Sequence, residues 1–341
     1  MIVGTVWGPI GPSPLAQGGR PDNGLTSVIA VNPNDPNIIY QGTAGGGVWR
    51  TTDGGATWSP LFDQQISLGV GNPSALAIDP NDTNTIYVGT SNRLTQQASA
   101  GLFRSTDGGA SWVRLGTGFP AGNVGDVTQF FNQRINVIIV DPANSQTVYL
   151  ASNTGVFRST NGGLNWGARG GNSNGDVRSL VLDTTSPTGN ARILYAGITN
   201  RGVFQSTDGA QNWGQILGAA TPAVAAALAG GGFSKALVAL APPTAPPAAG
   251  GIQVLYASLS GPRPAVPPPP PPPTDPVGLF ISTDQGGTWT QQGGAGIPPN
   301  TQGGYSFHMA VDPASPGDGA NDIIYLGAVG HARSTDSGAN F

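Results

Sequence analysis

The side chains in this sequence that could do chemistry are mostly aspartate and arginine. Every acidic residue is Asp, because the chain contains no Glu, and every basic residue except Lys235 is Arg. There are two His and no Cys, so disulfides, thiolate metal sites and cysteine nucleophiles are excluded. The chemistry left open is hydrolysis by a pair of carboxylates, or binding through arginine and histidine.

The candidates for a binding site are polar residues in variable segments that separate short, regular apolar runs. Such segments read as loops, where binding and catalytic residues concentrate. A pair drawn from Asp22, Asp63, Asp126 and Asp176 could supply the two carboxylates that general acid–base hydrolysis needs. The alternative for each candidate is a surface group that stabilises the fold. The full set is Asp63, Arg93, Asp126, Arg134, Asp176, Arg178, Arg201 and His308.

Six copies of an eight-residue motif, which we call the box turn, organise these segments. In Ser105–Trp112 the motif reads Ser-Thr-Asp-Gly-Gly-Ala-Ser-Trp. Ser and Asp can replace backbone hydrogen bonds in a tight turn, and glycine tolerates positive φ, so we predict a structural role. The copies are Thr51–Trp58, Ser105–Trp112, Ser159–Trp166, Ser206–Trp213, Ser282–Trp289 and Ser334–Phe341; their third residues are Asp53, Asp107, Asn161, Asp208, Asp284 and Asp336, and their closing tryptophans are Trp58, Trp112, Trp166, Trp213 and Trp289.

Each box turn follows a similar set of short apolar runs. In the first copy, the runs predict strands at Ser27–Pro33, Ile38–Thr43, Gly47–Thr52 and Thr57–Leu61. Four strands per repeat of roughly 50 residues are typical of propeller blades. The sequence therefore predicts an all-β chain: residues 1–341 form a single β-propeller of six four-stranded blades. The alternative is a fragment of a ring with seven or eight blades.

The motif carries a family resemblance. Ser-x-Asp-x-Gly-x-Thr-Trp resembles the Asp box, or BNR repeat, of sialidases, xyloglucan-cleaving glycosidases, sortilin-type receptors and photosystem II assembly factors. The first unit, AVNPNDPNIIYQGTAGGGVWRTTDGGATW, is most similar to bacterial exported proteins described as sialidase-like, sortilin-like or YVTN/BNR-like. The resemblance extends over essentially the whole chain and implies a propeller. It implies less about function, because the box recurs among unrelated activities.

The hydrolases of this group set conditions that the sequence meets only in part. Sialidases use a Tyr–Glu nucleophile pair, and the chain has no Glu. Xyloglucan-cleaving glycosidases use two Asp in a cleft between two propellers, whereas the six repeats of this chain account for a single propeller. We therefore expect a non-catalytic, exported binding or structural propeller that contacts a glycan or protein partner through loops on one face. The alternative is an Asp-box glycoside hydrolase, sialidase-like or xyloglucanase-like, that uses Asp carboxylates.

Composition limits the partners and the compartment. A net charge of −4 without a basic cluster argues against nucleic acid, and no apolar run reaches the roughly 18 residues of a membrane span. The first residues lack the pattern of a signal peptide. We expect a mature chain that is extracellular, at the cell surface or periplasmic. It could be a component of a larger extracellular assembly. No cofactor is expected; oxygen-rich turns could hold Ca²⁺, but turn chemistry explains them more simply.

Two segments depart from the repeat. Residues 241–277 form an Ala/Pro-rich insert within the fifth blade, and Pro267–Pro273 favours a polyproline II rod. Near the start of the chain, Trp7–Ile10 resembles the segment Trp58–Leu61 that follows the first box turn. We therefore expect residues 1–12 to supply a closing strand for the last blade.

Overall fold

The computed structural model describes most of the chain. The described residues are 26–43, 46–62, 75–90, 99–115, 130, 133–167, 169–229, 232–233, 235–243, 253–260, 278–292, 308–327 and 331–341. They form two compact units: residues 1–153 with 159–167 belong to the first, and residues 154–158 with 168–341 to the second. The expected closing strand at residues 1–12 and most of the insert at 241–277 lie outside the described residues.

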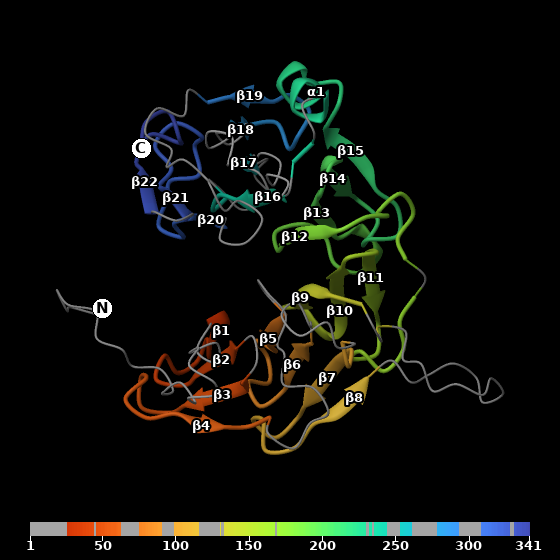
Figure 1. Ribbon diagram of the computed structural model, residues 1–341, viewed down its shortest axis with the longest axis vertical. Helices are drawn as coiled ribbons and strands as arrows, with labels where there is room; N and C mark the ends of the chain where they lie inside the picture. Colours follow the sequence, from red (N-terminus) through yellow and green to blue (C-terminus); the bar gives the residue numbers. More distant parts are fainter. Residues whose placement is uncertain are drawn as a thin grey trace, which may run out of the picture. The chain divides into compact units, whose positions relative to one another are not determined.

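The fold is an all-β, six-bladed propeller of small antiparallel sheets, as the sequence predicts (Figure 1). Each blade contains one box turn, and its strands follow one another in chain order. The strands are β1 (Thr26–Val31), β2 (Ile39–Thr43), β3 (Gly47–Thr51) and β4 (Ser59–Pro60); β5 (Leu76–Ile78), β6 (Ile86–Gly89), β7 (Leu102–Ser105) and β8 (Val113–Leu115); β9 (Ile135–Asp141), β10 (Asn144–Ser152) and β11 (Gly155–Ser159); β12 (Val177–Asp183), β13 (Ile193–Ile198), β14 (Gly202–Ser206) and β15 (Gly214–Leu217); β16 (Lys235–Leu240), β17 (Leu255–Ser260), β18 (Gly278–Ser282) and β19 (Thr290–Gln291); and β20 (His308–Val311), β21 (Ile324–Gly327) and β22 (His331–Ser334).

Two blades show fewer than four strands in the described part of the chain, and the fourth strand expected for the sixth blade, at residues 1–12, lies outside that part. Among the described residues, the third and sixth sheets contain three strands each. In the third blade, the segment after Trp166 is rich in glycine, which weakens a strand. Gly170 still donates its N–H to the carbonyl of Val156 at 2.9 Å, and Gly171 forms an isolated bridge with Asn212 instead of continuing the sheet.

Helix is scarce, which agrees with the all-β class that the sequence predicts. Among the described residues, the helices are α1 (Pro222–Ala229), between the fourth and fifth blades, and a short 3₁₀ helix at Gly189–Ala191. Neither has the length and hydrophobicity needed to cross a membrane.

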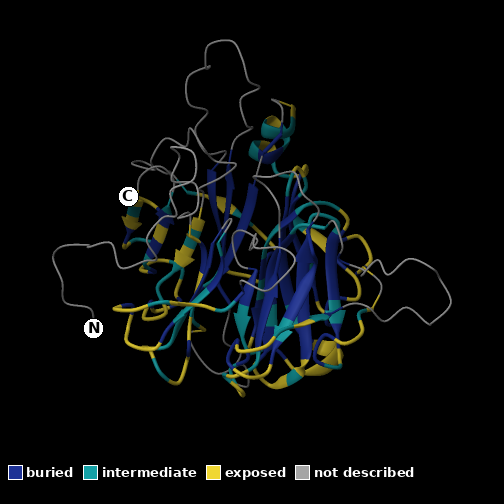
Figure 2. Cartoon of the chain, turned by 60° about the horizontal axis from the view of Figure 1, so that its bottom comes forward, coloured by how far each residue is buried: buried dark blue, intermediate teal, exposed yellow. Residues whose placement is uncertain are grey.

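The core lies between neighbouring blades. In the first unit, Tyr40, Val48 and Phe103 join one buried cluster; in the second unit, Tyr195 and Phe280 join another. Figure 2 shows that the strands are mostly buried, whereas the turns are largely exposed. The first strands of successive blades are in contact within each unit: β1 with β5 and β5 with β9, then β12 with β16 and β16 with β20.

Side-chain hydrogen bonds hold each box turn. The Ser105 hydroxyl donates to Asp107 at 2.7 Å and accepts the Gly109 N–H, while the Asp107 carboxylate accepts the Ser111 N–H at 2.8 Å. Gly108 and Gly109 have φ values of +70° and +93°, which glycine adopts without a steric penalty. Asn161 accepts the equivalent bonds in the third blade. One side chain thus replaces several backbone partners in each turn.

Candidate functional site

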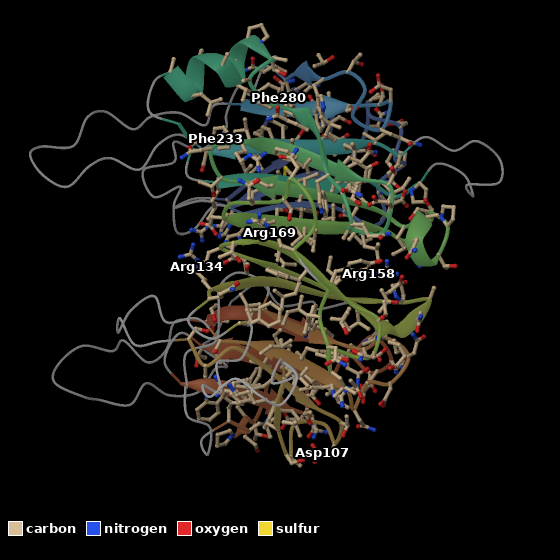
Figure 3. All side chains as sticks on the ribbon, turned by 90° about the vertical axis from the view of Figure 1, so that its right-hand side faces the viewer. Asp107, Arg134, Arg158, Arg169, Phe233 and Phe280 are labelled. Carbon is tan, nitrogen blue, oxygen red and sulfur yellow. The ribbon has the colours of Figure 1, made fainter. Side chains whose placement is uncertain are left out.

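Every blade presents two different ends. The turn end carries the box turn and the hairpin between the first and second strands. The link end carries the hairpin between the second and third strands and the connections to neighbouring blades. In the second unit, Arg169 and Phe233 lie toward the end opposite Arg158; in the first unit, Arg134 lies opposite Asp107 (Figure 3). The predicted binding candidates that the structure describes all lie at link ends.

Carboxylates are concentrated at the turn ends. Five described aspartates hold box turns, and four more accept a backbone N–H just after the first strand of their blade, as Asp79 does from Asn81 at 2.9 Å. Among the described residues, Asp176 is the only carboxylate at a link end. The turn-end aspartates are Asp35, Asp53, Asp79, Asp82, Asp107, Asp141, Asp183, Asp208, Asp284, Asp312, Asp318, Asp322 and Asp336.

Hydrogen bonding keeps box-turn carboxylates ionised. Bonds from the Ser111 hydroxyl, the Ser111 N–H and the Ser105 hydroxyl lower the pKa of Asp107 to about 2. The pKa of Asp284 is lowered to about 2 by equivalent bonds, chiefly from Thr288. These aspartates are therefore poor proton donors at neutral pH, which argues against an acid–base role for them.

Asp176 and Arg178 form an ion pair at the start of β12. Arg178 Nε lies 2.7 Å from Asp176 Oδ2, and the side chains of Arg178 and Asp176 are 10% and 21% exposed. The Asp176 carbonyl also accepts the N–H of Thr199 at 3.0 Å, which fixes the backbone beside β13. The structure thus brings together two of the predicted candidates in a rigid, partly buried position.

Arg201 binds the loop that precedes β12. Its guanidinium donates to the carbonyl of Asn174 at 2.7 Å and to the side-chain oxygen of Asn172 at 2.7 Å. The guanidinium carbon lies 4.5 Å from the centre of the Phe204 ring. Burial, followed by the nearby charge of Arg169, lowers the pKa of Arg201. Arg201 therefore positions this loop and adds positive charge to it.

His308, at the start of β20, is exposed at the link end of the sixth blade. The partial loss of hydration of the imidazole, and then the positive charges of Lys235 and His331, lower the pKa of His308. His308 and His331 flank Gly327 in neighbouring strand positions. Neutral imidazole is therefore favoured at His308 near pH 7.

The other candidates contribute less to a defined site. Arg134 precedes β9, where its N–H donates to the Asn153 side chain at 2.8 Å. Asp63, Arg93 and Asp126 lie outside the described residues. Among the residues that are described, no group of three or more His and Asp is close enough to hold a metal ion.

Arg169 and Lys235, basic residues near the link ends, were not among the sequence candidates. Arg169 is exposed, and Lys235 is buried at the start of β16. Arg169 stands in a glycine-rich segment that the repeat pattern cannot align, and Lys235 is the first residue of a strand that otherwise reads as core. The rarity of lysine in this chain was the one available signal for Lys235.

Comparisons with known proteins find xyloglucanases among the relatives of this chain. No family model matches the chain. The curated relatives are xyloglucanases. One from Paenibacillus sp. is 28% identical over 159 residues, which is 46% of this chain and 12% of that enzyme. One from Acetivibrio thermocellus is 30% identical over 138 residues, 32% of this chain and 15% of that enzyme. The matched segments thus span only a small part of these relatives.

Solved structures share the fold over nearly the whole chain. An ancestral GH74 enzyme superposes with a TM-score of 0.63 at 24% identity, covering 97% of this chain and 38% of its own. The GH74 xyloglucanase from Xanthomonas campestris gives a TM-score of 0.60 at 18% identity and covers 94% of this chain and 46% of its own. YCF48 bound to D1 peptide superposes with a TM-score of 0.54 at 14% identity and covers 93% of this chain and 80% of its own. At these identities, the likeness establishes the propeller fold alone.

Proposed function

We propose that the protein is a glycoside hydrolase of the xyloglucanase type that acts on a β-glucan chain at the link ends of its blades. The observation that carries the proposal is the sequence relationship to the xyloglucanases of Paenibacillus and Acetivibrio, at 28% and 30% identity. The propeller fold shared with GH74 enzymes supports it. The activity is proposed to be exerted outside the cytoplasm, where such polysaccharides are found.

Glycoside hydrolysis needs two carboxyl groups with different roles. One protonates the leaving oxygen, and the other activates water or attacks the sugar. Asp176 is the candidate for the second role, because its carboxylate lies at a link end, 2.7 Å from Nε of Arg178. Asp63 and Asp126 fall in the connections between blades and are the candidates for the first role.

The test is hydrolysis of xyloglucan by the purified chain, measured as new reducing ends. Replacing Asp176, Asp126 or Asp63 one at a time with Asn removes a titratable carboxyl group while preserving shape. We expect the variant of each catalytic residue to lose about a hundredfold or more in kcat, the usual size of an acid–base contribution. Asp107→Asn is the matched control, because it reproduces the box turn that Asn161 forms in the third blade. Undiminished turnover in all three of these variants would overturn the assignment of the catalytic groups.

A second candidate function is non-catalytic binding of a glycan or protein. The observation that favours it is the commitment of nearly all described carboxylates to turns, with Asp176 as the only one at a link end. Binding of xyloglucan by the wild-type chain without any release of reducing ends would support this candidate over hydrolysis.

A further inference from the structure

Two arginines meet the same loop at the link end of the fourth blade. The loop runs from Arg169 to Asp176, and Arg201 reaches it from the β13–β14 hairpin through its bonds to Asn172 and Asn174. At the start of the loop, Arg169 donates to the carbonyl of Thr154 at 3.3 Å. These contacts fix the direction from which each guanidinium approaches the loop.

The position of Arg169 is also set by packing. A Cβ atom placed on Gly155 would lie 2.4 Å from Arg169 Cδ and 2.6 Å from Cγ, so the aliphatic stem lies directly over the backbone of β11. The residue as a whole remains exposed. The stem is therefore supported while the guanidinium stays accessible, and its planar fork keeps donors beyond the one that bonds Thr154.

The loop carries an excess of positive charge. Asp176 is paired with Arg178, and the other carboxylates described in the second unit lie at turn ends. Among the described residues, neither Arg169 nor Arg201 forms a salt bridge with a carboxylate. The lowered pKa of Arg201, caused by burial and then by Arg169, agrees with this arrangement. An anion bound here would relieve the repulsion between like charges.

We propose that Arg169, supported by Arg201, binds the carboxylate of a uronic acid residue in an acidic glycan. A guanidinium matches a carboxylate in a planar, bidentate geometry. Asn174 lies on the same loop and is exposed; its amide oxygen accepts from Arg201, and its amide N–H groups can donate to sugar hydroxyls. The inference rests on the proposed function, because it names a feature of the glycan that the link end would select.

The test compares an oligosaccharide that carries glucuronic acid with its neutral, carboxyl-reduced counterpart, using calorimetry on the full chain. We expect the acidic glycan to bind about tenfold more tightly, as one charge-assisted contact provides. Raising the salt concentration to about 0.5 M should reduce this advantage, because accessible charges are screened. Arg169→Gln should abolish the advantage and leave binding of the neutral glycan unchanged, and Arg169→Lys should retain part of it.

Arg333→Gln is the matched control, because it removes the same charge from an exposed residue of β22, close to a box turn. If Arg169→Gln and Arg333→Gln lowered the affinity for the acidic glycan equally, the effect would be one of net charge and the proposal would be overturned. Equal affinity of the wild-type chain for the two glycans would also overturn it. Binding of an N-acetylated peptide through its terminal carboxylate, without binding of the acidic glycan, would also overturn it. Retained selectivity for the acidic glycan in a chain that neither binds nor cleaves xyloglucan would overturn only the proposed hydrolase.

Discussion

The hydroxyl of Tyr87 donates a hydrogen bond of 3.1 Å to the carbonyl oxygen of Gly162. Tyr87 belongs to the second blade and Gly162 to the box turn of the third. Arg104 donates to the same carbonyl at 2.8 Å. Tyr40 and Arg50 of the first blade contact Gly108 in the same way. A box turn therefore organises its own blade and also accepts the side chains that join the preceding blade to it.

Replacement of Tyr87 by Phe should destabilise the first unit by about 1 kcal/mol, the usual net value of a buried hydrogen bond. The loss is limited because Arg104 still satisfies the Gly162 carbonyl. The midpoint of urea unfolding measures the effect. Tyr325→Phe is the control, since Tyr325 is 41% exposed and bonds Asp312 of its own blade; a larger loss there than at Tyr87 would contradict the argument.

The box-turn aspartates should make stability depend on pH in the acid range. The pKa values of Asp107, Asp284 and Asp336 in the folded chain are about 2, below the ordinary 3.8. The unfolded chain thus takes up protons first as the pH falls. The stabilisation is fully present above about pH 4 and is lost as the pH drops through about 2.

Carbon-13 NMR of the carboxyl groups measures this directly, and urea unfolding of Asp107→Asn at several pH values checks its effect on stability. The difference in unfolding free energy between wild type and variant should shrink from pH 5 to pH 2. Titration of Asp107 near its ordinary pKa, or a difference independent of pH, would contradict the prediction.

Local patterns were sufficient to predict the repeated part of the fold. Box turns, strands and the blade count follow from short-range spacing, because the second strand of every copy places a tyrosine, and a small residue two positions later, at the same point. The irregular segment after Trp166, which forms no fourth strand among the described residues of the third blade, was harder to foresee. Gly170 and Gly171 disfavour a regular strand, but their alternative partners, such as Gln211, are set by the tertiary fold.

Close packing between blades predicts a strong effect of one methyl group. A Cβ atom on Gly197, in β13, would lie 2.1 Å from the carbonyl oxygen of Ala236 in β16. Gly197→Ala should therefore force the backbones apart and cost about 3 kcal/mol, at the upper end for overpacking. Gly214→Ala is the control, because a Cβ there meets nothing within 4 Å. Chemical unfolding of both variants gives the comparison, and similar stabilities would refute the packing argument.

The candidate site was less predictable than the fold. Residue type and loop position identified Asp176, Arg178 and Arg201, but could not show that the first two pair or that Arg201 holds Asn172 and Asn174. Such contacts depend on how non-repeated loops meet in space. Variable loops have no internal copy to compare with, so the sequence gives composition there but no geometry.

A buried carboxylate joins the fifth and sixth blades. Asp322 is fully buried and accepts the N–H of Gly317 at 2.6 Å, the N–H of Gly319 at 3.1 Å and the hydroxyl of Tyr256 at 2.7 Å. Burial, with a further contribution from Asp322, raises the pKa of Tyr256. This one side chain therefore anchors a surface loop and replaces the box-turn contact made by Tyr87 in the second blade.

Asp322→Ala should lower the free energy of unfolding by about 3 kcal/mol or more, because three donors lose their acceptor. Asp322→Asn keeps one acceptor oxygen and removes the negative charge, so it should cost less and move the Tyr256 pKa back toward 10. Urea unfolding measures the first effect, and ultraviolet titration of the tyrosines measures the second. Asp318→Ala, at an exposed aspartate in the same loop, should lower the free energy of unfolding less than either substitution of Asp322. An Asp322→Ala chain as stable as Asp318→Ala would show that this carboxylate does not join the two blades.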